Sequence, residues 1–579
     1  MLDGLLEERL RSAVAALLPD ADLTGVRLRP CPEPKFGDYQ TNALMALAKA
    51  RRLNPRQLAA AVAARLEVSQ WCEPAEAAGA GFLNLRLKTA ALAAVLQAAL
   101  RGEHRFFQPA ASPQTVVVDF SSPNVAKPMH VGHIRSTILG ECLARTLRLL
   151  GHRVITDNHL GDWGTQFGKL LLGWKRHLDP KALAAAPIAE MERLYKLVSA
   201  QAERDSSLLA SARQELVNLQ NGDPDNQRLW REMIAHSRRE FDAIYARLGV
   251  KFDYTLGESF YNPQLKAIVQ QLHDLGLARL SEGASVVFFD DVPELKEHPA
   301  IILKRDGGAN YTTTDLATLA YRLETWRPDQ IIYVTDARQQ LHFRQLFAIF
   351  RRWQPAATVK LAHVWFGSIL GEDGKPFRSR AGETIKLADL LDEAEERALR
   401  VVAEKNPGLG EAERRQIARI VGLGALKYAD LLPNRQSDYV FSWDKMLALN
   451  GNTAPYLQYA YTRIRSIFRK LPQAEPDAAG WRELAQTRLS LEGPEETRLA
   501  KHLLNFNLVL RAVAEEYRPN YLCNYLYELA GHFTGFYESC PVLKAPEPAR
   551  ASRLALCELS GQVLRQGLAV LGIETTDQM

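Results

Sequence analysis

The stretch VVVDFSSPNVAKPMHVGHIRSTILGE (116–141) decides the fold class of this chain. It begins inside TVVVDF (115–120), a continuous apolar run of the kind expected for a strand that is covered on both faces. Apolar residues then recur at helical spacing up to Gly151, which lies where a helix C-terminal glycine belongs. A second strand-like run, HRVITDN (152–158), completes a β–α–β unit. This order predicts an α/β fold with a Rossmann-like, doubly wound parallel sheet.

The composition of the whole chain is that of a soluble globular protein with several domains. Its 579 residues exceed a single hydrophobic core, and no apolar run approaches the roughly 18 residues of a membrane span. The first residues, MLDGLLEERL (1–10), carry acidic residues and do not resemble a signal peptide. The six cysteines are scattered without a CxxC pair, which indicates a reducing compartment. We therefore expect a cytoplasmic protein without a membrane partner or a tightly bound, protein-ligated metal.

Changes of pattern along the chain predict four domains. A helix-rich, charged insertion at about 179–250 is expected between the halves of the sheet. Strand-like runs return after it at SVVFFD (285–290), AIILKR (300–305) and QIIYVTD (330–336). The predicted domains are an α+β N-terminal domain (1–108), the Rossmann-like domain (109–395), a helical connecting region (396–449) and an all-α C-terminal domain (450–579).

Polar chemistry is concentrated where the first strand meets its helix. Ligands of parallel sheets bind beyond the carboxyl ends of the strands, and the first turn of a helix exposes unpaired N–H groups that favour anions. His130 and His133 add imidazole donors, Gly132 leaves room for a flat ring, and Lys127 adds a full charge. We therefore predict that a nucleoside triphosphate binds here, with its phosphates against the histidines and the lysine.

Other interpretations of this stretch remain open. The two histidines could bind a metal, although no third ligand lies nearby, or they could be exposed helix caps. No GxxxxGK[ST] or GxGxxG motif follows a strand, so the two commonest phosphate loops are absent from the sequence. A second phosphate contact is expected from GEDGKPFRSRAGETIKL (371–387), which taken alone could be an ordinary exposed turn. Its basic candidates are Lys375, Arg378 and Arg380.

HVGH (130–133) resembles the HIGH signature of class I aminoacyl-tRNA synthetases, and longer motifs are similar to those of the bacterial arginyl-tRNA synthetase family. They occur in the family's order: SSPNVAKPMHVGHIRST (121–137), DNHLGDWGTQFGKL (157–170), GESFYN (257–262), YTTTDLA (311–317), ARQQLHF (337–343) and GNTAPYLQYAYTRIRSI (451–467). The second family signature, KMSKS in many synthetases, is degenerate here as KPFRSRAG (375–382). The resemblance implies that Lys127 supplies the phosphate-neutralising charge otherwise given by the KMSKS lysine.

The resemblance implies arginine–tRNA ligase activity. ATP with Mg²⁺ would activate L-arginine to arginyl-adenylate, and the arginyl group would pass to the 3′-terminal ribose of tRNA(Arg). It also implies a monomer without an obligate protein partner, and a need for bound tRNA during activation. Two alternatives exist. One is an HxGH nucleotidyltransferase acting on a small molecule, which the chain length disfavours; the other is a non-catalytic RNA-binding protein descended from a synthetase, which the intact HVGH motif disfavours.

The arginine site is assigned through the same resemblance. A guanidinium presents five N–H donors in a planar fork, so its pocket needs carboxylates and other acceptors. Tyr311 and Asp315 are four residues apart and would share one helix face. Without the resemblance, Asp315 could be an exposed residue or a cap and Glu258 a loop carboxylate. The implied arginine contacts are Asp119, Asn124, Glu258, Tyr311, Asp315 and Gln339, and His342 is implied for the ATP pocket.

The C-terminal region mixes basic and aromatic residues. Splayed RNA bases are commonly held by aromatic stacking together with arginine or lysine contacts. By resemblance this region is the anticodon-binding domain, although most of its aromatic residues could instead pack the helical core. The tRNA-binding candidates are Tyr456, Tyr459, Arg463 and Arg465. In the N-terminal domain, Phe36 and Tyr39 are candidates for contact with the outer corner of the tRNA.

Overall fold

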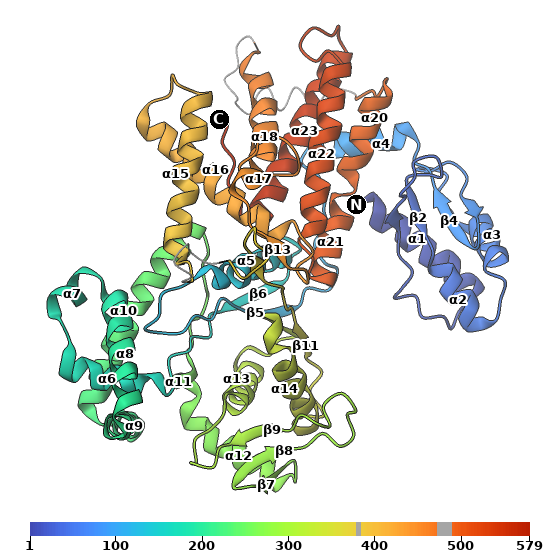
Figure 1. Cartoon of the computed structure of the whole chain (residues 1–579). Coiled ribbons are helices and arrows are strands. Elements are labelled where there is room, and N and C mark those ends of the chain that lie inside the picture. The colour runs from blue at the N-terminus through green and yellow to red at the C-terminus, as the bar shows by residue number, and fades with distance from the viewer. Residues whose placement is uncertain (378–383, 472–488) are drawn as a thin grey trace. The chain divides into compact units, whose positions relative to one another are not determined.

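The computed structural model describes residues 1–377, 384–471 and 489–579. It divides into two compact units (Figure 1). The first unit contains Met1–Ala110, Val402–Tyr428 and Lys445–Met579, and the second contains Ala111–Val401 and Ala429–Asp444. The four domains expected from the sequence stay a prediction.

A four-stranded parallel sheet forms the centre of the second unit, in the order β11–β10–β5–β6 (Figure 1). β5 passes through α5 to its neighbour on one side, whereas β10 passes through α14 to a strand on the other side, which creates a switch point between β5 and β10. The predicted doubly wound parallel sheet is confirmed. Its strands are β5 (Thr115–Phe120), β6 (Arg153–Asp157), β10 (Gln330–Val334) and β11 (Lys360–His363).

Helix α5 (Val131–Leu149) packs directly on β5. The valines at 116–118 have no exposed surface, as predicted for a strand covered on both faces. At the crossing of helix and strand, Gly140 faces the Phe120 ring so closely that an added Cβ would overlap it. The helix can approach the strand this closely because residue 140 has no side chain.

We expect Gly140→Ala to lower the free energy of unfolding by about 1–3 kcal/mol, because a methyl group must be forced into a filled core. Chemical denaturation measures this change. Gly531→Ala is the matched control, since Gly531 lies in helix α22 (Asn520–Ser539) with open space where a Cβ would be placed. There alanine should stabilise the protein by about 0.5–1 kcal/mol through helix propensity. Equal stability of the two variants would contradict this account of the helix–strand contact.

A group of five helices follows β6 in the chain, and the predicted helix-rich insertion is indeed helical. Asp179, Asp205 and Asp223 each accept N–H groups of the turn that follows them, which fixes where α7, α9 and α10 begin. Leu172, Val198 and Ala212 form a small core of their own between the helices. The helices are α6 (Gln166–His177), α7 (Pro180–Ala185), α8 (Pro187–Arg204), α9 (Ser206–Gln220) and α10 (Pro224–Leu248).

A separate antiparallel sheet of three strands contains β7 (Ala278–Ser281), β8 (Ala284–Val287) and β9 (Ala300–Leu303). The runs at 285–290 and 300–305 therefore do not extend the parallel sheet, and their expected place in its second half was wrong. Glu282 and Gly283 both have positive φ and close a tight hairpin, whereas neighbouring parallel strands need a crossover of a dozen or more residues.

Helices pack against the parallel sheet and against the three-stranded sheet of the second unit (Figure 1). One continuous hydrophobic core joins residues of β5, β8, β9, β10, α12, α13 and α14. The further elements of this part of the chain are α11 (Glu258–Tyr261), η1 (Asn262–Gln264), α12 (Leu265–Asp274), α13 (Tyr311–Trp326), η2 (Ala337–Gln339), α14 (Gln340–Trp353), β12 (Ile369–Leu370), α15 (Leu387–Lys405), β13 (Tyr439–Val440) and α17 (Trp443–Met446).

The first unit combines an α+β part with helices from the second half of the chain. The N-terminal part has an antiparallel sheet in the order β1–β2–β4–β3. Its strands are β1 (Arg29–Pro30), β2 (Tyr39–Thr41), β3 (Glu76–Ala78) and β4 (Phe82–Leu85). The helices of this part are α1 (Leu2–Leu17), α2 (Ala43–Arg51), α3 (Pro55–Arg65) and α4 (Thr89–Leu100). The later helices are α16 (Glu411–Leu431), α18 (Ala454–Arg469), α20 (Pro494–Leu504), α21 (Phe506–Glu516), α22 and α23 (Ala549–Val570). None of the helices in the described ranges combines the length and apolar character needed to cross a membrane.

Candidate active site

The loop between β5 and α5 has a strained backbone. Ser121, Ser122 and Ala126 have φ values of 73°, 47° and 62°, in the left-handed region that residues with a Cβ rarely adopt. The surroundings hold this geometry, because the Ser121 N–H donates to Ser136 Oγ (2.8 Å) and the Ser122 N–H donates to Asn158 Oδ1 (3.1 Å). Strain that neighbouring groups enforce is typical of functional sites.

His130 and His133 use one ring nitrogen each to begin α5. His130 Nδ1 accepts the Gly132 N–H, and His133 Nδ1 accepts the His130 N–H, both at 3.1 Å. Burial lowers the pKa of His133 to about 3 and also lowers the pKa of His130, which Arg338 and Lys127 lower further. A neutral imidazole carries one proton, so in both residues that proton lies on Nε2. Each histidine therefore offers an Nε2–H donor to a ligand.

The backbone N–H groups of the same turn already have acceptors. Val131 donates to the Ile385 carbonyl (2.9 Å), Gly132 to His130 Nδ1, and His133 to the His130 carbonyl (2.8 Å). The prediction that unpaired N–H groups of this turn meet the phosphates was therefore wrong for these three residues. A Cβ on Gly132 would lie 2.9 Å from His130 Cε1, so this glycine makes room for the imidazole.

The segment that follows the basic loop is paired with the start of α5. His130 and Lys386 form an antiparallel bridge, and the Leu387 N–H donates to the Met129 carbonyl at 2.9 Å. Two segments about 255 residues apart in the sequence thus lie side by side, with the Lys386 side chain beside the loop. No local pattern in the sequence indicates a role for Lys386, because the segment that it pairs with is so distant in the chain.

The basic loop itself is described only in part. Lys375 is exposed in a turn after β12, where its N–H donates to Asp373 Oδ1 (3.1 Å). Arg378 and Arg380 lie outside the described residues. The phosphate contacts expected of all three basic residues stay predictions.

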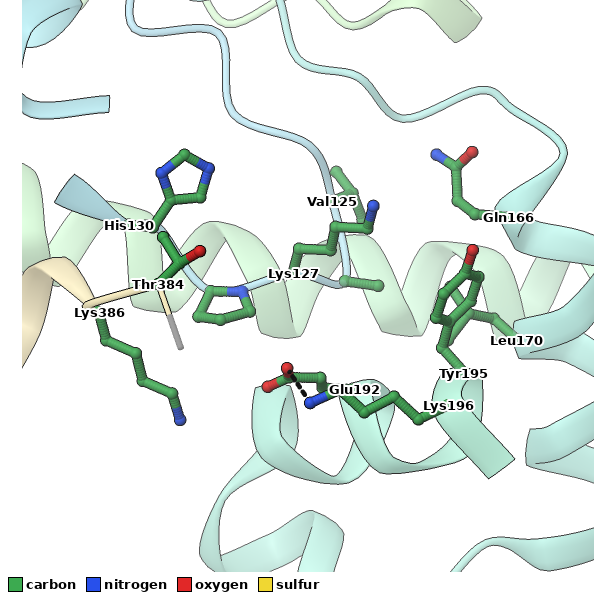
Figure 2. Close-up of a pocket in the computed structure, with 12 residues that line it drawn as sticks. Val125, Lys127, His130, Gln166, Leu170, Glu192, Tyr195, Lys196, Thr384 and Lys386 are labelled. Carbon is green, nitrogen blue, oxygen red and sulfur yellow. Dashed lines mark ion pairs between the residues drawn. The ribbon is translucent and has the colours of Figure 1, made fainter. Parts of the chain in front are cut away.

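A pocket of about 620 Å³ opens beside this junction, and Lys127 and His130 line it (Figure 2). In that view His130 and Lys386 lie on one side, Tyr195 lies on the other, and Lys127 lies between them. The charges at the pocket are mainly positive, which suits an anionic ligand. Within the described ranges, no three His, Cys, Asp or Glu side chains form a group that could hold a metal ion.

A second cluster joins α13 to α14. Tyr311 and Asp315 lie one turn apart on α13, as the spacing predicts. His342 Nε2 lies 2.5 Å from Asp315 Oδ2, and its ring centroid lies 4.7 Å from that of Tyr311. The structure thus brings His342 together with two of the arginine candidates. Its expected contact with ATP stays a prediction.

Glu258 begins α11 in an acidic environment. Burial, followed by the charges of Asp315 and Asp162, raises the pKa of Glu258 to about 7, although His159 opposes this shift. Asp162 holds the start of the helix, because its carboxylate accepts the Ser259 N–H (2.8 Å) and hydroxyl (2.7 Å). A bound cation would favour the charged form of Glu258. Asp162 and His159 were not selected from the sequence, although both lie inside the motif DNHLGDWGTQFGKL.

Asp119 is largely engaged within the protein. Its Oδ2 lies 2.5 Å from Nη2 of Arg322, and its Oδ1 accepts the Ser122 hydroxyl at 3.2 Å. Arg322 is fully buried and also binds Asp157 at 2.8 Å. The sequence did not indicate this internal ion pair. A contact between Asp119 and the arginine substrate stays a prediction. The Asp119 side chain is less exposed than that of Asp315.

The other two arginine candidates also lie at the carboxyl edge of the parallel sheet. Asn124 is exposed in the loop after β5, and its Oδ1 occupies the space where Gly161 would carry a Cβ. Gln339 is exposed in η2, which follows β10. The segments that directly follow β5 and β10 therefore carry candidates for both substrates, as expected at a switch point.

Among the tRNA-binding candidates on α18, Tyr459 is the most available, with 49% of its surface exposed. The Arg463 guanidinium lies 4.6 Å from the Tyr537 ring centroid. Arg465 Nη1 lies 3.0 Å from the buried Glu558 carboxylate, so this arginine also stabilises the helical core. Contacts of these residues with RNA stay predictions.

The remaining aromatic candidates differ in exposure. The ring of Tyr456 lies 5.7 Å from that of Tyr527, and both are partly accessible. Phe36 is 46% exposed, with Lys35 Nζ 4.7 Å from its ring centroid. Tyr39 is only 1% exposed, so the prediction that it contacts tRNA was wrong.

Comparisons with known proteins cover nearly the whole chain. Three family models match: "Arginyl tRNA synthetase N terminal domain" (4–87), "tRNA synthetases class I (R), catalytic domain" (95–443) and "DALR anticodon binding domain" (457–579). The arginine–tRNA ligase of Escherichia coli strain K12 is 46% identical over the full length of both chains. The Thermus thermophilus arginyl-tRNA synthetase structure is 26% identical with a TM-score of 0.84, covering 100% of both chains. The Plasmodium falciparum arginyl-tRNA synthetase structure is 28% identical with a TM-score of 0.82, covering 100% of this chain and 99% of that one.

Proposed function

The chain belongs to the arginyl-tRNA synthetase family, and we propose how its residues divide the work of charging tRNA with arginine. It is a class I arginine–tRNA ligase, which uses ATP to activate arginine and transfers the arginyl group to tRNA. The nucleotidyltransferase and the non-catalytic RNA-binding protein are not favoured, because a ligase matches the chain from end to end. The observation that best supports the division of roles is that the imidazole donors follow β5, while the acidic cluster is joined to segments that follow β6 and β10: the Glu258 N–H donates to the Leu160 carbonyl (3.0 Å), and Asp315 pairs with His342.

The triphosphate is assigned to the loop between β5 and α5. The arginine carboxylate attacks the α-phosphate, the bond between the α- and β-phosphates breaks, and pyrophosphate leaves. The Nε2–H groups of His130 and His133 and the ammonium of Lys127 stabilise the negative charge that grows in this step. The two histidines need no reorganisation for this, because backbone N–H groups already hold their rings. Magnesium enters as part of the MgATP substrate and neutralises further phosphate charge. The protein positions and neutralises, so no covalent enzyme intermediate is required.

The guanidinium of arginine is assigned to the acidic cluster. Glu258 and Asp315 provide carboxylate acceptors, and the Tyr311 hydroxyl provides a third. His342 orients Asp315 through its Nε2, and Asp162 orients the helix start that carries Glu258. Lysine in this site would leave part of these acceptors unpaired, which is a strong basis for discrimination. Asn124, Gln339 and Asp119 remain proposed contacts for the α-amino and carboxylate groups.

Arginine affinity should fall as the pH falls below 7. The pKa of Glu258 is about 7 without a ligand, whereas a guanidinium binds its charged form. Below that pKa the free enzyme must lose a proton in order to bind arginine. We expect arginine to bind about tenfold more weakly at pH 6 than at pH 8, since one group that titrates near pH 7 changes its charged fraction by about that factor.

Calorimetry in two buffers of different ionisation enthalpy measures both the affinity and the proton release. Glu258→Gln is the control, because it cannot titrate and should remove most of the pH dependence. An affinity that stays constant between pH 6 and pH 8 would show that Glu258 is already charged in the free enzyme.

The tRNA is a substrate of the family, and we propose that α18 and the N-terminal part contact it through their exposed aromatic and basic residues. Tyr459 and Phe36 are the most exposed of the aromatic candidates. The monomeric state, the cytoplasmic location and the lack of an obligate protein partner remain predictions from the sequence.

Pyrophosphate exchange with each amino acid in turn, with and without tRNA, tests the proposed function. Among the amino acids tested, we expect only arginine to support exchange, and we expect this exchange to require tRNA. Exchange with another amino acid would overturn the specificity, and exchange without tRNA would remove only the proposed tRNA requirement.

A further inference from the structure

The helical insertion contacts the phosphate-binding loop at two points, on either side of the Ala126–Lys127 peptide bond. From α8, the Tyr195 ring centroid lies 5.7 Å from Lys127 Nζ. From α10, Ser237 Oγ accepts the Ala126 N–H at 2.9 Å. Figure 2 shows Tyr195 and Lys127 beside each other at the pocket. The insertion is therefore placed to control where the lysine points.

The contact with α10 fixes the backbone. Ala126 is 3% exposed and has a φ of 62°, so its buried N–H needs an acceptor if this strained conformation is to persist. Ser237 provides it, while its own hydroxyl donates to the Met233 carbonyl at 2.9 Å. Ser237 is completely buried, which leaves the loop little freedom at this residue.

The contact with α8 acts on the side chain. Lys127 is exposed, and a lysine ammonium on four flexible methylene groups has no preferred direction of its own. Within the described part of the chain, no carboxylate or hydroxyl pairs with this ammonium. The face of the Tyr195 ring attracts it through the negative part of the ring quadrupole. The ring is thus the group that limits the directions open to Lys127.

A second lysine contacts the same ring. Lys169 Nζ lies 5.5 Å from the same ring centroid and donates to Ser199 Oγ at 3.1 Å. Like charges repel, so an anchored Lys169 disfavours movement of the Lys127 ammonium along the ring toward α6. The pocket that Lys127 shares with His130 is also lined by Tyr195, so the contact with the ring keeps the ammonium inside that pocket.

We propose that Tyr195 is a positioning residue for ATP activation: its ring holds the Lys127 ammonium inside the pocket that Lys127 shares with His130. The helical insertion then takes part in the first reaction step through α8 and α10. This inference rests on the phosphate-neutralising role assigned to Lys127. It concerns the aromatic ring and does not require the Tyr195 hydroxyl.

Two substitutions separate the ring from the rest of the side chain. Tyr195→Phe keeps the ring face and should stay within about twofold of the parent enzyme in pyrophosphate exchange. Tyr195→Leu keeps apolar volume without a ring and should lower kcat/KM for ATP by roughly three- to tenfold, the range of a partly exposed cation–π contact. The KM for arginine should not change, whereas general damage to the fold would affect both substrates.

A double-mutant cycle with Lys127→Ala completes the test. If Tyr195 acts through Lys127, Tyr195→Leu should change kcat/KM for ATP by less than twofold once Lys127 is alanine. A full additional loss in that background, or no loss from Tyr195→Leu alone, would overturn the inference. Unchanged activity of Lys127→Ala itself would instead overturn the role of the lysine. The two failures are therefore distinguishable.

Discussion

Replacing Lys127 by alanine should slow ATP-dependent activation of arginine by roughly 10²–10³-fold, the usual effect of removing one group that stabilises transition-state charge. Lys127 lies beside His130 at the pocket, and its loop is held in a strained conformation. The KMSKS motif, whose lysine neutralises phosphate charge in many synthetases, is degenerate here as KPFRSRAG (375–382). The positive charge of Lys127 is therefore harder for another residue to replace. Pyrophosphate exchange under saturating tRNA measures the effect.

The affinity for tRNA should change little in the same variant, since the lysine is assigned to the triphosphate. Lys266→Ala serves as the control, because Lys266 is an exposed lysine on α12, outside the residues assigned to the site. A Lys127→Ala enzyme that activates arginine normally but binds tRNA weakly would show that the lysine contacts RNA and not ATP.

Glu258→Gln should raise the KM for arginine by roughly 10–100-fold, because a hydrogen bond to a charged group contributes about 1.5–3 kcal/mol. Glutamine keeps the size of the side chain and one acceptor oxygen but removes the charge that the guanidinium needs. The KM for ATP should change by less than about threefold. Initial-rate kinetics with each substrate varied in turn measures the ratio of the two effects.

The control for this variant is Glu297→Gln, which removes a carboxylate from an exposed position. It should leave both KM values unchanged. If Glu258→Gln raised the KM for arginine and the KM for ATP equally, Glu258 would not belong to the arginine pocket.

Local pattern was sufficient to predict the parallel sheet. The apolar run 115–120, the helix periodicity after it and Gly151 describe one β–α–β unit without reference to distant residues. Tyr311 and Asp315 were likewise predictable as neighbours, because helical spacing alone places them on one face.

The features that could not be predicted from the sequence are those that depend on contacts between distant segments of the chain. The N–H of Val131 is taken by Ile385, whose proximity no local pattern reveals. The buried Arg322 between Asp119 and Asp157 is another example, since an arginine in a helix is usually expected on the surface. Strand-like runs also do not say which sheet they join, and so 285–290 was assigned to the wrong sheet.

The central claim is that both small substrates bind at the carboxyl edge of the parallel sheet, with phosphates at the start of α5 and the guanidinium at the acidic cluster. The most direct measurement is a crystal structure with arginine and a non-hydrolysable ATP analogue. We expect the α-phosphate within reach of His130 Nε2 and the guanidinium between Glu258 and Asp315. A complex with either ligand bound away from these residues would contradict the claim.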